Sequence, residues 1–206
     1  MIKYPRTLHL PYSNSMAKDD KIQYDLSEFE NKHVIITEKI DGENTTMTRT
    51  NIYARSPDSI DHPSRHYVKG VWGNIKHLIP EGYRVCGENA YAKHSIEYNN
   101  LRDYFLVFSL WFDELCFSWD TTATMSNNLG LHMVPVLYDG IYNEDVVKHI
   151  ITTLDTTRQE GIVMRVAGAF NKESFEKCVV KWVRPNHVED DVHWINKPIN
   201  KNKLAQ

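Results

Sequence analysis

A lysine at the end of a strand-like run is the residue of this sequence best suited to do chemistry. Lys39 follows the β-branched segment 34–37 and precedes the turn signal Asp41-Gly42. A lysine amine attacks only when neutral, and partial desolvation or nearby cations lower its pKa from about 10.4 toward neutrality. We therefore expect Lys39 to be a nucleophile with a lowered pKa. The alternative is a solvated lysine beside an ordinary hairpin turn.

Strand and helix patterns predict an α+β scaffold around this lysine. The run over 104–112 is apolar enough to be a strand buried on both faces. Apolar side chains at three- and four-residue spacing predict a helix over 67–79, and Asn143 is placed to cap a second helix that runs to Leu154. The order of elements favours mainly antiparallel sheets flanked by helices. Further strands are predicted over 33–40, 45–50, 52–55, 83–89, 161–166 and 178–183.

Length and composition indicate one globular domain. The chain has 206 residues, of which 41% are hydrophobic, and a formal net charge of -3, which excludes a disordered chain and a wholly basic nucleic-acid binder. No apolar run approaches the roughly 20 residues of a membrane-spanning helix, so we expect a cytoplasmic protein without membrane contact. The 3 cysteines are widely spaced, which predicts buried free thiols. We expect residues 1–32 to form an arm packed on a single domain (1–206) and residues 196–206 to form a flexible tail.

Further motifs follow Lys39-Ile40-Asp41-Gly42 along the chain. A single K-x-D-G string is weak evidence, but several motifs in a fixed order are jointly specific. They are Arg55, Cys86-Gly87-Glu88-Asn89, Phe105-Leu106-Val107-Phe108, Glu160-Gly161-Ile162-Val163 and Val180-Lys181-Trp182-Val183. The set resembles the covalent nucleotidyltransferase superfamily of polynucleotide ligases and mRNA capping enzymes, most closely its ATP-dependent RNA ligases. The resemblance implies a nucleotidyltransferase (ATP-grasp-like ligase) core and covers most of the chain.

The resemblance implies that three cationic residues do the phosphoryl chemistry. Lys39 would attack the α-phosphorus of ATP and form a lysyl-AMP adduct. Arg55 and Lys181 would contact the phosphates and neutralise charge as pyrophosphate leaves. The bland alternative for Arg55 is exposed surface charge, whereas a lysine such as Lys181 inside an apolar strand needs a partner.

Other motif residues would bind the nucleoside. By resemblance, Glu88 would hold the ribose hydroxyls, while Phe108 and Val163 would lie on the two faces of adenine. Glu38 would help to fix the base, whereas Phe105 is assigned to the core. The alternative is that both phenylalanines are core residues.

A divalent metal ion is also implied, and hard oxygen ligands suit Mg²⁺, with Mn²⁺ as a substitute. Glu160 would bind the metal directly or through water. Asp41 and Asn44 would join its outer shell, and Asn44 would also contact the nucleotide. The alternative for Asp41 is hairpin-turn chemistry.

The sequence departs from the superfamily pattern in two places. Many relatives carry a second lysine two residues before the position of Lys181, where this chain has Val179; Lys177 shares the strand parity and is the candidate substitute. DNA ligases and capping enzymes add an OB-fold domain after the last motif, and NAD-dependent ligases add a domain for the nicotinamide end. We expect neither here, which favours ATP and an RNA ligase.

The expected function is ATP-dependent joining of an RNA 5′-phosphate to a 3′-hydroxyl, with a separate partner possible for end recognition. A DNA-nick ligase and a capping guanylyltransferase remain alternatives within enzymes. A catalytically silent RNA-binding module of the same fold is the alternative outside them. The nucleotide that labels the protein and the strand that is sealed would distinguish the enzymes from one another.

Two further groups of polar and aromatic residues are candidates for binding sites. The segment His187–His193 lacks a recognised metal-ligand spacing, so structural or capping roles are favoured there. Cations and aromatic residues scattered along the chain could line an RNA groove, or be simply solvated. This second group is Arg6, His9, Arg65, His66, Lys69, Trp72, Tyr91, Lys93 and His94.

Overall fold

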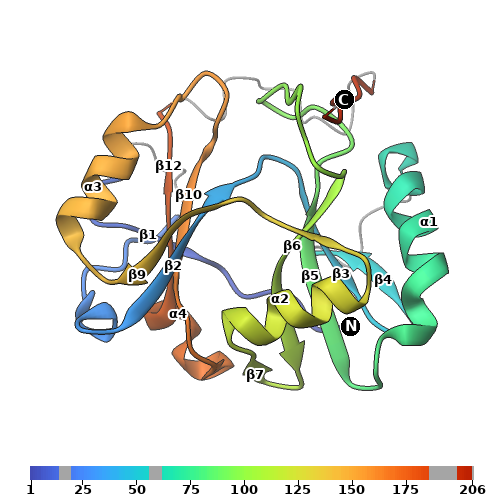
Figure 1. Ribbon diagram of the computed structural model, residues 1–206, viewed down its shortest axis with the longest axis horizontal. Coiled ribbons are helices and arrows are strands. Elements are labelled where there is room, and N and C mark those ends of the chain that lie inside the picture. The colour runs from blue at the N-terminus through green and yellow to red at the C-terminus, as the bar shows by residue number, and fades with distance from the viewer. Residues whose placement is uncertain (14–19, 56–61, 186–198, 206) are drawn as a thin grey trace.

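Two β-sheets lie side by side and form the body of the protein (Figure 1). The computed structural model describes residues 1–13, 20–55, 62–185 and 199–205. The chain passes from one sheet to the other at residues 40–42, directly after Lys39. The predicted α+β architecture with mainly antiparallel sheets is confirmed.

The first sheet has five strands and carries Lys39 at the end of a central strand. All neighbours are antiparallel except β1 and β12, which pair in parallel. Its order is β1 (Leu8–His9), β12 (Val179–Val183), β10 (Gly161–Val166), β2 (His33–Lys39) and β9 (Val136–Ile141).

The second sheet is built around β6 (Phe105–Phe112), in which every residue is buried except Phe108, which is partly buried, and Phe112, which is exposed. The predicted burial of this strand on both faces is confirmed. The order is β11 (Phe170–Asn171), β7 (Leu115–Cys116), β6 (Phe105–Phe112), β5 (Tyr83–Asn89), β3 (Glu43–Met47) and β4 (Ile52–Ala54), with β8 (His132–Met133) pairing in parallel with β6.

Helices cover the outer sides of the two sheets, with α3 flanking the first sheet and α1 flanking the second (Figure 1). Asn143 caps α3 as predicted, because its Oδ1 accepts hydrogen bonds from the amides of Asp145 (2.9 Å) and Val146 (3.3 Å). The predicted helix over 67–79 forms as an α-helix and a final 3₁₀ turn. The helices are α1 (His66–Ile75), α2 (Trp119–Asn128), α3 (Glu144–Thr153) and α4 (Phe175–Cys178), with 3₁₀ turns η1 (Ser27–Phe29), η2 (Pro63–Arg65), η3 (Lys76–Leu78) and η4 (Lys172–Ser174). Of the helices in the described ranges, none has the length and apolar character that a bilayer crossing requires.

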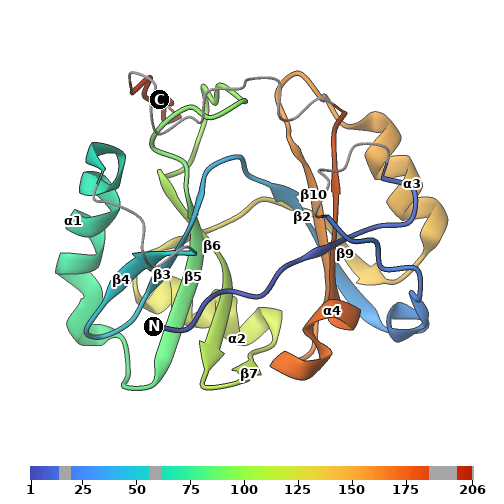
Figure 2. The same ribbon diagram turned by 180° about the vertical axis from the view of Figure 1, so that it is seen from behind.

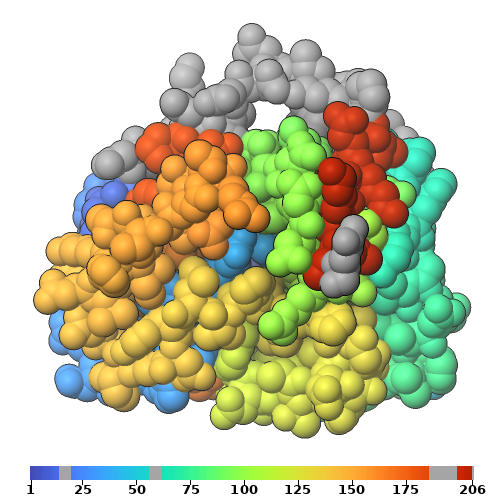
Figure 3. Space-filling model, turned by 45° about the horizontal axis from the view of Figure 1, so that its top comes forward, coloured from blue at the N-terminus to red at the C-terminus, as the bar shows by residue number. Residues whose placement is uncertain are grey.

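Both ends of the chain are integrated into the body. Residues 8–9 form the edge strand β1 of the first sheet. Residues 199–205 lie against the segment 90–104 (Figure 3), which contradicts the expected flexible tail. Asn202 explains the difference: it is 1% exposed, its Nδ2 donates to the Ala90 carbonyl (2.9 Å), and its Oδ1 accepts from the Tyr98 amide (2.9 Å). The segment His187–His193 lies outside the described residues.

Candidate active site

A cavity of about 280 Å³ lies between the two sheets and is closed on one side by the N-terminal segment. Side chains from β2, β10 and β12 line it on the first-sheet side, and side chains from β3, β5 and β6 on the other. The residues around it include Tyr4, Arg6, Asp20, Thr37, Glu38, Lys39, Asn44, Arg55, Glu88, Phe108, Val163, Arg165 and Lys181. Eight of the nine residues predicted to bind nucleotide are therefore brought together, and the ninth, Glu160, contacts Lys39.

Lys39 is paired with Glu160 inside the protein. Its Nζ lies 2.5 Å from Oε2 of Glu160, and the two side chains are 25% and 7% exposed. Register brings them together, because Lys39 pairs with Gly161 across β2 and β10, and Glu160 directly precedes Gly161. A Cβ atom at Gly161 would lie 2.0 Å from the Trp182 carbonyl oxygen, so β10 approaches β12 this closely only with glycine there.

The pKa of Lys39 lies above its ordinary range, and the predicted lowering is wrong for this arrangement. Burial alone lowers the pKa of the ammonium, but the negative charges of Glu160, Glu88 and Asp41 outweigh burial and raise it. The cause is the Glu160 carboxylate, which strand register places against the amine and which the order of residues in the sequence does not reveal. An attack by Lys39 therefore requires that its proton be removed and that these negative charges be compensated.

Lys181 lies on the same face of the first sheet as Lys39. It pairs with Val163 in β10, which in turn pairs with Thr37 in β2, so these three side chains form one row. Burial lowers the pKa of Lys181, partly offset by the Asp20 carboxylate, whose Oδ1 lies 3.7 Å from the Nζ atom. This strand lysine has its expected partner, and the partner lies in the N-terminal region.

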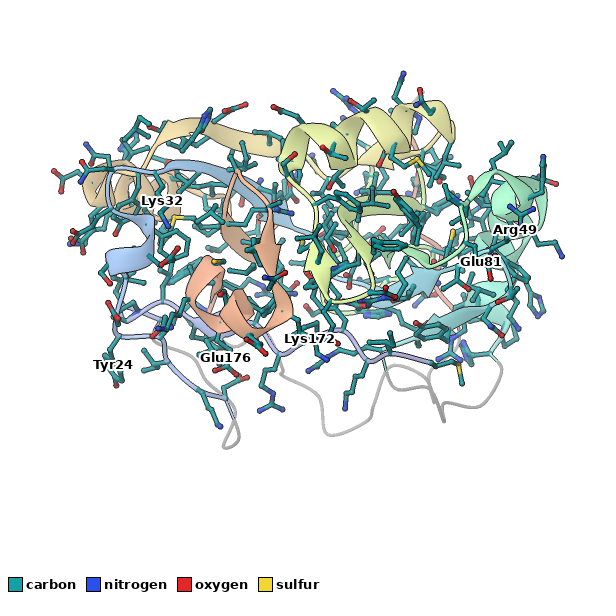
Figure 4. The ribbon with its side chains drawn as sticks, turned by 90° about the horizontal axis from the view of Figure 1, so that it is seen from below. Tyr24, Lys32, Arg49, Glu81, Lys172 and Glu176 are labelled. Carbon is teal, nitrogen blue, oxygen red and sulfur yellow. The ribbon has the colours of Figure 1, made fainter. Side chains whose placement is uncertain are left out.

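Lys177 does not substitute for the lysine missing at Val179. Lys177 belongs to α4 and is exposed. The neighbouring side chain of Glu176 points outward from the underside of the molecule (Figure 4). Alternation along a strand does not apply to Lys177, because the chain is helical there and β12 begins only at Val179. Arg165, which pairs with Val179 across β10 and β12, instead lines the cavity as a cation.

Arg165 was not identified from the sequence, and most of its hydrogen bonds go to backbone carbonyls, with one from Nη1 to the Cys116 sulfur. It is 4% exposed, and its Nη2 donates to the Phe117 carbonyl (2.7 Å) and the Gly168 carbonyl (3.3 Å). These bonds connect β10 to the segments at Phe117 and Gly168. The alternation of Arg165 with apolar neighbours in a buried strand was the signal that could have identified it.

Glu88 and Asn44 form the polar part of the second-sheet wall. They are directly paired across β5 and β3. Burial raises the pKa of Glu88 to about 8, against the lowering effect of Lys39, and the negative charges of Glu160, Asp41 and Glu43 add to the rise. The Oδ1 atom of Asn44 is buried and has no hydrogen-bond partner in the described protein. Such an acceptor is costly unless a ligand satisfies it.

Asp41 does not face the cavity. Its Oδ2 accepts hydrogen bonds from the Ser95 amide (2.7 Å), the Ser95 hydroxyl (2.7 Å) and the Ile96 amide (2.8 Å). These bonds hold the loop at 94–96 against the end of β2. We therefore do not assign Asp41 to a metal ion. Its carboxylate stabilises the turn and the adjoining loop, which was the alternative role given for this residue.

Phe108 provides an aromatic surface inside the cavity. It is partly buried, and its ring lies 5.3 Å from the ring of Tyr4 in an edge-to-face arrangement. Val163 lines the same cavity from the other sheet. Phe105 is 1% exposed and belongs to the core, as predicted.

Glu38 and Arg55 border the cavity with other contacts. Glu38 pairs with Ile162 across β2 and β10, and its side chain leaves the strand on the face opposite to that of Thr37. Its Oε2 accepts a hydrogen bond from the Gln159 side chain (3.1 Å). Burial raises the pKa of Glu38. The Nε of Arg55 donates to the Tyr4 carbonyl (3.3 Å). Arg55 therefore connects the second sheet to the N-terminal segment.

The cations and aromatic residues that were candidates to line an RNA groove do not form one surface. Arg65 is buried and makes two bonds to the Glu43 carboxylate (2.7 and 2.5 Å). Trp72 donates its indole N–H to the Thr48 carbonyl (2.7 Å), and Tyr91 stacks on Tyr67 at 6.1 Å. Arg6 alone of that group lines the cavity.

The oxygen atoms around the cavity fit a divalent metal ion that takes most of its ligands from the phosphates of a substrate and from water. Across the described ranges no three His, Cys, Asp or Glu side chains are grouped closely enough to hold a metal. Mg²⁺ is usually held by one or two protein oxygens together with substrate phosphates. Glu160 and the unsatisfied Oδ1 of Asn44 supply oxygens of that kind.

Solved structures with the same fold include several ligases. An archaeal ATP-dependent RNA ligase superposes with a TM-score of 0.59 at 17% identity, covering 89% of this chain and 48% of that one. A putative ATP-dependent DNA ligase from Aquifex aeolicus gives 0.57 at 18% identity (89% and 50% covered), and a Naegleria gruberi RNA ligase mutant with ATP and Mn gives 0.51 at 13% identity (77% and 51% covered). This chain thus spans about half the length of these proteins. A search of curated protein sequences found no match.

The fold matches that of the ligase nucleotidyltransferases, in agreement with the resemblance of the motifs. The family model described as RNA ligase matches residues 32–183, which includes both cavity lysines and the second-sheet wall. The chain belongs to the RNA ligase family.

Proposed function

We propose that this protein is an ATP-dependent RNA ligase that acts through a lysyl-AMP intermediate. The observation that carries the proposal is the position of Lys39: its amine contacts a buried carboxylate at the wall of a cavity that also holds Lys181, Arg55 and Phe108. A solvated lysine beside a turn would have neither the cavity nor the buried partner.

In the first step, Nζ of Lys39 forms a bond to the α-phosphorus of ATP, and the bond from that phosphorus to the bridging oxygen of the β-phosphate breaks. Pyrophosphate leaves with the electron pair of the broken bond. Glu160 contacts the amine and burial raises its pKa, so it would accept the proton that Lys39 loses and pass it to solvent before its carboxylate binds a metal ion. Lys181 and Arg55 stabilise the negative charge on the phosphates.

The second-sheet wall would select and orient the nucleoside. Phe108 and Val163 would enclose adenine, which needs an aromatic or apolar surface on each face. Glu88 and Asn44 would bind the ribose and neighbouring oxygens. A divalent ion held by Glu160 and Asn44 with the phosphates would supply further positive charge to the reacting phosphoryl group.

Two further transfers would complete the reaction. An oxygen of the RNA 5′-phosphate attacks the lysyl-AMP phosphorus, the phosphorus–nitrogen bond breaks, and Lys39 leaves and regains its proton. The 3′-hydroxyl oxygen then attacks the 5′-phosphate, loses its proton, and displaces AMP. Membership of the RNA ligase family supports RNA ends as the substrate, and end recognition by a separate partner remains part of the proposal.

Labelling with nucleotides tests the first step. Purified protein is incubated with α-³²P-ATP and Mg²⁺, denatured and separated on a gel, and the modified peptide is mapped. We expect label on Lys39, at least about 10³-fold less label in Lys39→Ala, and unchanged labelling in the control Lys32→Ala, which removes an exposed lysine near the start of β2. Label that persists in Lys39→Ala would refute the proposal, and preferential labelling by GTP would favour a guanylyltransferase.

A DNA-nick ligase is the second candidate, because the Aquifex aeolicus match is a putative DNA ligase. Nicked duplexes with RNA or DNA on either side of the break separate the two functions. We expect faster sealing when RNA provides the ends. Faster sealing of an all-DNA nick would replace the proposed substrate and leave the lysyl-AMP chemistry in place.

A further inference from the structure

A short N-terminal segment crosses from one sheet to the other and forms part of the cavity wall (Figure 2). We define it as the crossing segment, residues 4–7. All of its side chains line the cavity together with Lys39, Arg55 and Lys181. It lies outside the range 32–183 that matches the RNA ligase family. Roles for its residues therefore do not follow from family membership.

Both ends of the crossing segment are fixed. At one end, the Tyr4 ring packs edge-to-face on Phe108 (5.3 Å) and Phe175 (5.5 Å), and the Tyr4 carbonyl accepts the bond from Arg55. At the other end, β1 pairs with β12, and the Leu10 amide donates to the Lys181 carbonyl (2.8 Å). The segment is thus attached to both of the predicted phosphate-binding cations.

Arg6 is the one cation of the crossing segment. It is half-buried and stands two residues from each fixed end. Two residues span at most about 7 Å, so the backbone of Arg6 cannot move far from either attachment. A long side chain held in this way lines the same cavity as Arg55 and Lys181, and ordering it on a ligand there has a reduced entropic cost.

The charges of the cavity indicate what such a cation would bind. Adduct formation removes the positive charge of Lys39, and Lys181 and Arg55 remain for the α-phosphate. Asp20 adds a negative charge, since its carboxylate lies 3.7 Å from Lys181 and 3.1 Å from His9. The departing pyrophosphate carries several negative charges and needs a cation of its own.

We propose that Arg6 binds the β- and γ-phosphates of ATP and the pyrophosphate formed from them. This inference rests on the proposed function. It assigns Arg6 to the first step and to its reversal, in which a pyrophosphate oxygen attacks the lysyl-AMP phosphorus, the phosphorus–nitrogen bond breaks, ATP forms, and Lys39 regains a proton. It gives Arg6 no role in the two steps on RNA.

The test separates these steps in the chain of 206 residues. Three reactions are measured with Arg6→Ala: adduct formation from ATP, loss of AMP from purified adduct on addition of pyrophosphate, and sealing of RNA that already carries a 5′-adenylate. We expect the first two to fall about 10- to 100-fold and the third to stay within about twofold. Lys3→Ala, which removes an exposed lysine outside the cavity wall, is the matched control and should change none of them.

Each result supports or overturns the inference. Equal behaviour of Arg6→Ala and Lys3→Ala overturns it, and so does a loss of all three reactions. A loss confined to sealing of adenylated RNA also overturns it, because Arg6 would then bind the RNA 5′-phosphate. If Arg6→Ala melts at a lower temperature, Arg6→Gln and Arg6→Lys decide: a defect in the first two reactions with Gln that Lys partly restores supports the inference, and wild-type rates with Gln refute it. Absence of any adduct in the wild-type protein would instead refute the proposed function.

Discussion

The two walls of the cavity hold their polar groups in different ways. On the first sheet the charged groups are already paired inside the protein, Lys39 with Glu160 and Lys181 with Asp20. On the second sheet the polar groups are less well satisfied: Asn44 has a buried acceptor without a partner, and the pKa of Glu88 is raised to about 8. One wall is neutralised before a ligand binds, and the other carries an energetic cost that a ligand can relieve.

Under the proposed function, this difference predicts that the phosphates of the nucleotide bind at the first sheet and its nucleoside at the second. Phosphates binding at the first sheet must exchange one set of ionic contacts for another, which limits net affinity but retains strong interactions for the transition state. A nucleoside binding at the second sheet gains hydrogen bonds for groups that lacked them. We therefore expect substitutions on the first sheet to change rates and substitutions on the second sheet to change affinity and stability.

The largest effect on rate, after loss of Lys39, is expected for Lys181→Ala. Removal of this cation should slow adduct formation about 100- to 1000-fold, because charge on the phosphoryl group is then poorly compensated. The measurement is the initial rate of labelling at saturating ATP. Lys177→Ala, on the exposed side of α4, should stay within about twofold of wild type; a comparable loss there would return Lys177 to the site.

Phe108→Ala and Phe105→Ala form a second comparison within one strand. Loss of Phe108 should raise the KM for ATP about 10-fold through lost contact with the base. Loss of Phe105, which is 1% exposed, should instead lower the free energy of unfolding by about 3–5 kcal/mol. ATP titrations and urea unfolding of both variants measure the two effects. Equal destabilisation by the two substitutions would make both residues core and contradict the assignment of Phe108.

The smallest effect concerns the pH dependence of stability. The folded protein raises the pKa of Glu88 from 4.5 to about 8, so the fold favours the protonated form. This contribution to stability is complete below pH 4.5 and is lost as the pH rises through about 8. Glu88→Gln, which mimics the protonated form, should therefore gain stability relative to wild type between pH 5 and pH 9, on the order of 1–2 kcal/mol.

Thermal unfolding of both proteins at several pH values, without nucleotide, provides that measurement. A difference that does not change with pH would mean that Glu88 titrates normally. It would also remove the energetic distinction between the two walls.

Strong local patterns made much of the fold predictable. The strands over 83–89 and 161–166 occur at the predicted residues, and the Asn143 cap forms as expected. The strand β9 and helix α2 were missed because their signals are weak. Val136–Ile141 includes Asp139 and Gly140, and Trp119–Asn128 is rich in threonine and asparagine, which are poor helix formers. Tertiary packing stabilises both elements.

The residue types in the motifs made it possible to predict which side chains would line the cavity, but not which side chains each of them would contact. Lys39, Glu88 and Lys181 could be chosen because of residue type and context. The raised pKa of Lys39 and the turning of Asp41 toward Ser95 depend on register between distant segments, which the sequence does not display. The same reason hid Tyr4 and Asp20, and it left Arg6 only as a possible RNA-groove residue, because the place of all three depends on the path of the N-terminal segment.

The parallel pairing of β1 with β12 has a consequence for biosynthesis. His9 and Lys181 are neighbours in the sheet but are separated by about 170 positions in the chain. During translation, the N-terminal strand emerges from the ribosome long before the strand it pairs with. The cavity is therefore completed only after β12 has been synthesised, and under the proposed function nascent chains should be unable to retain ATP until β12 has emerged.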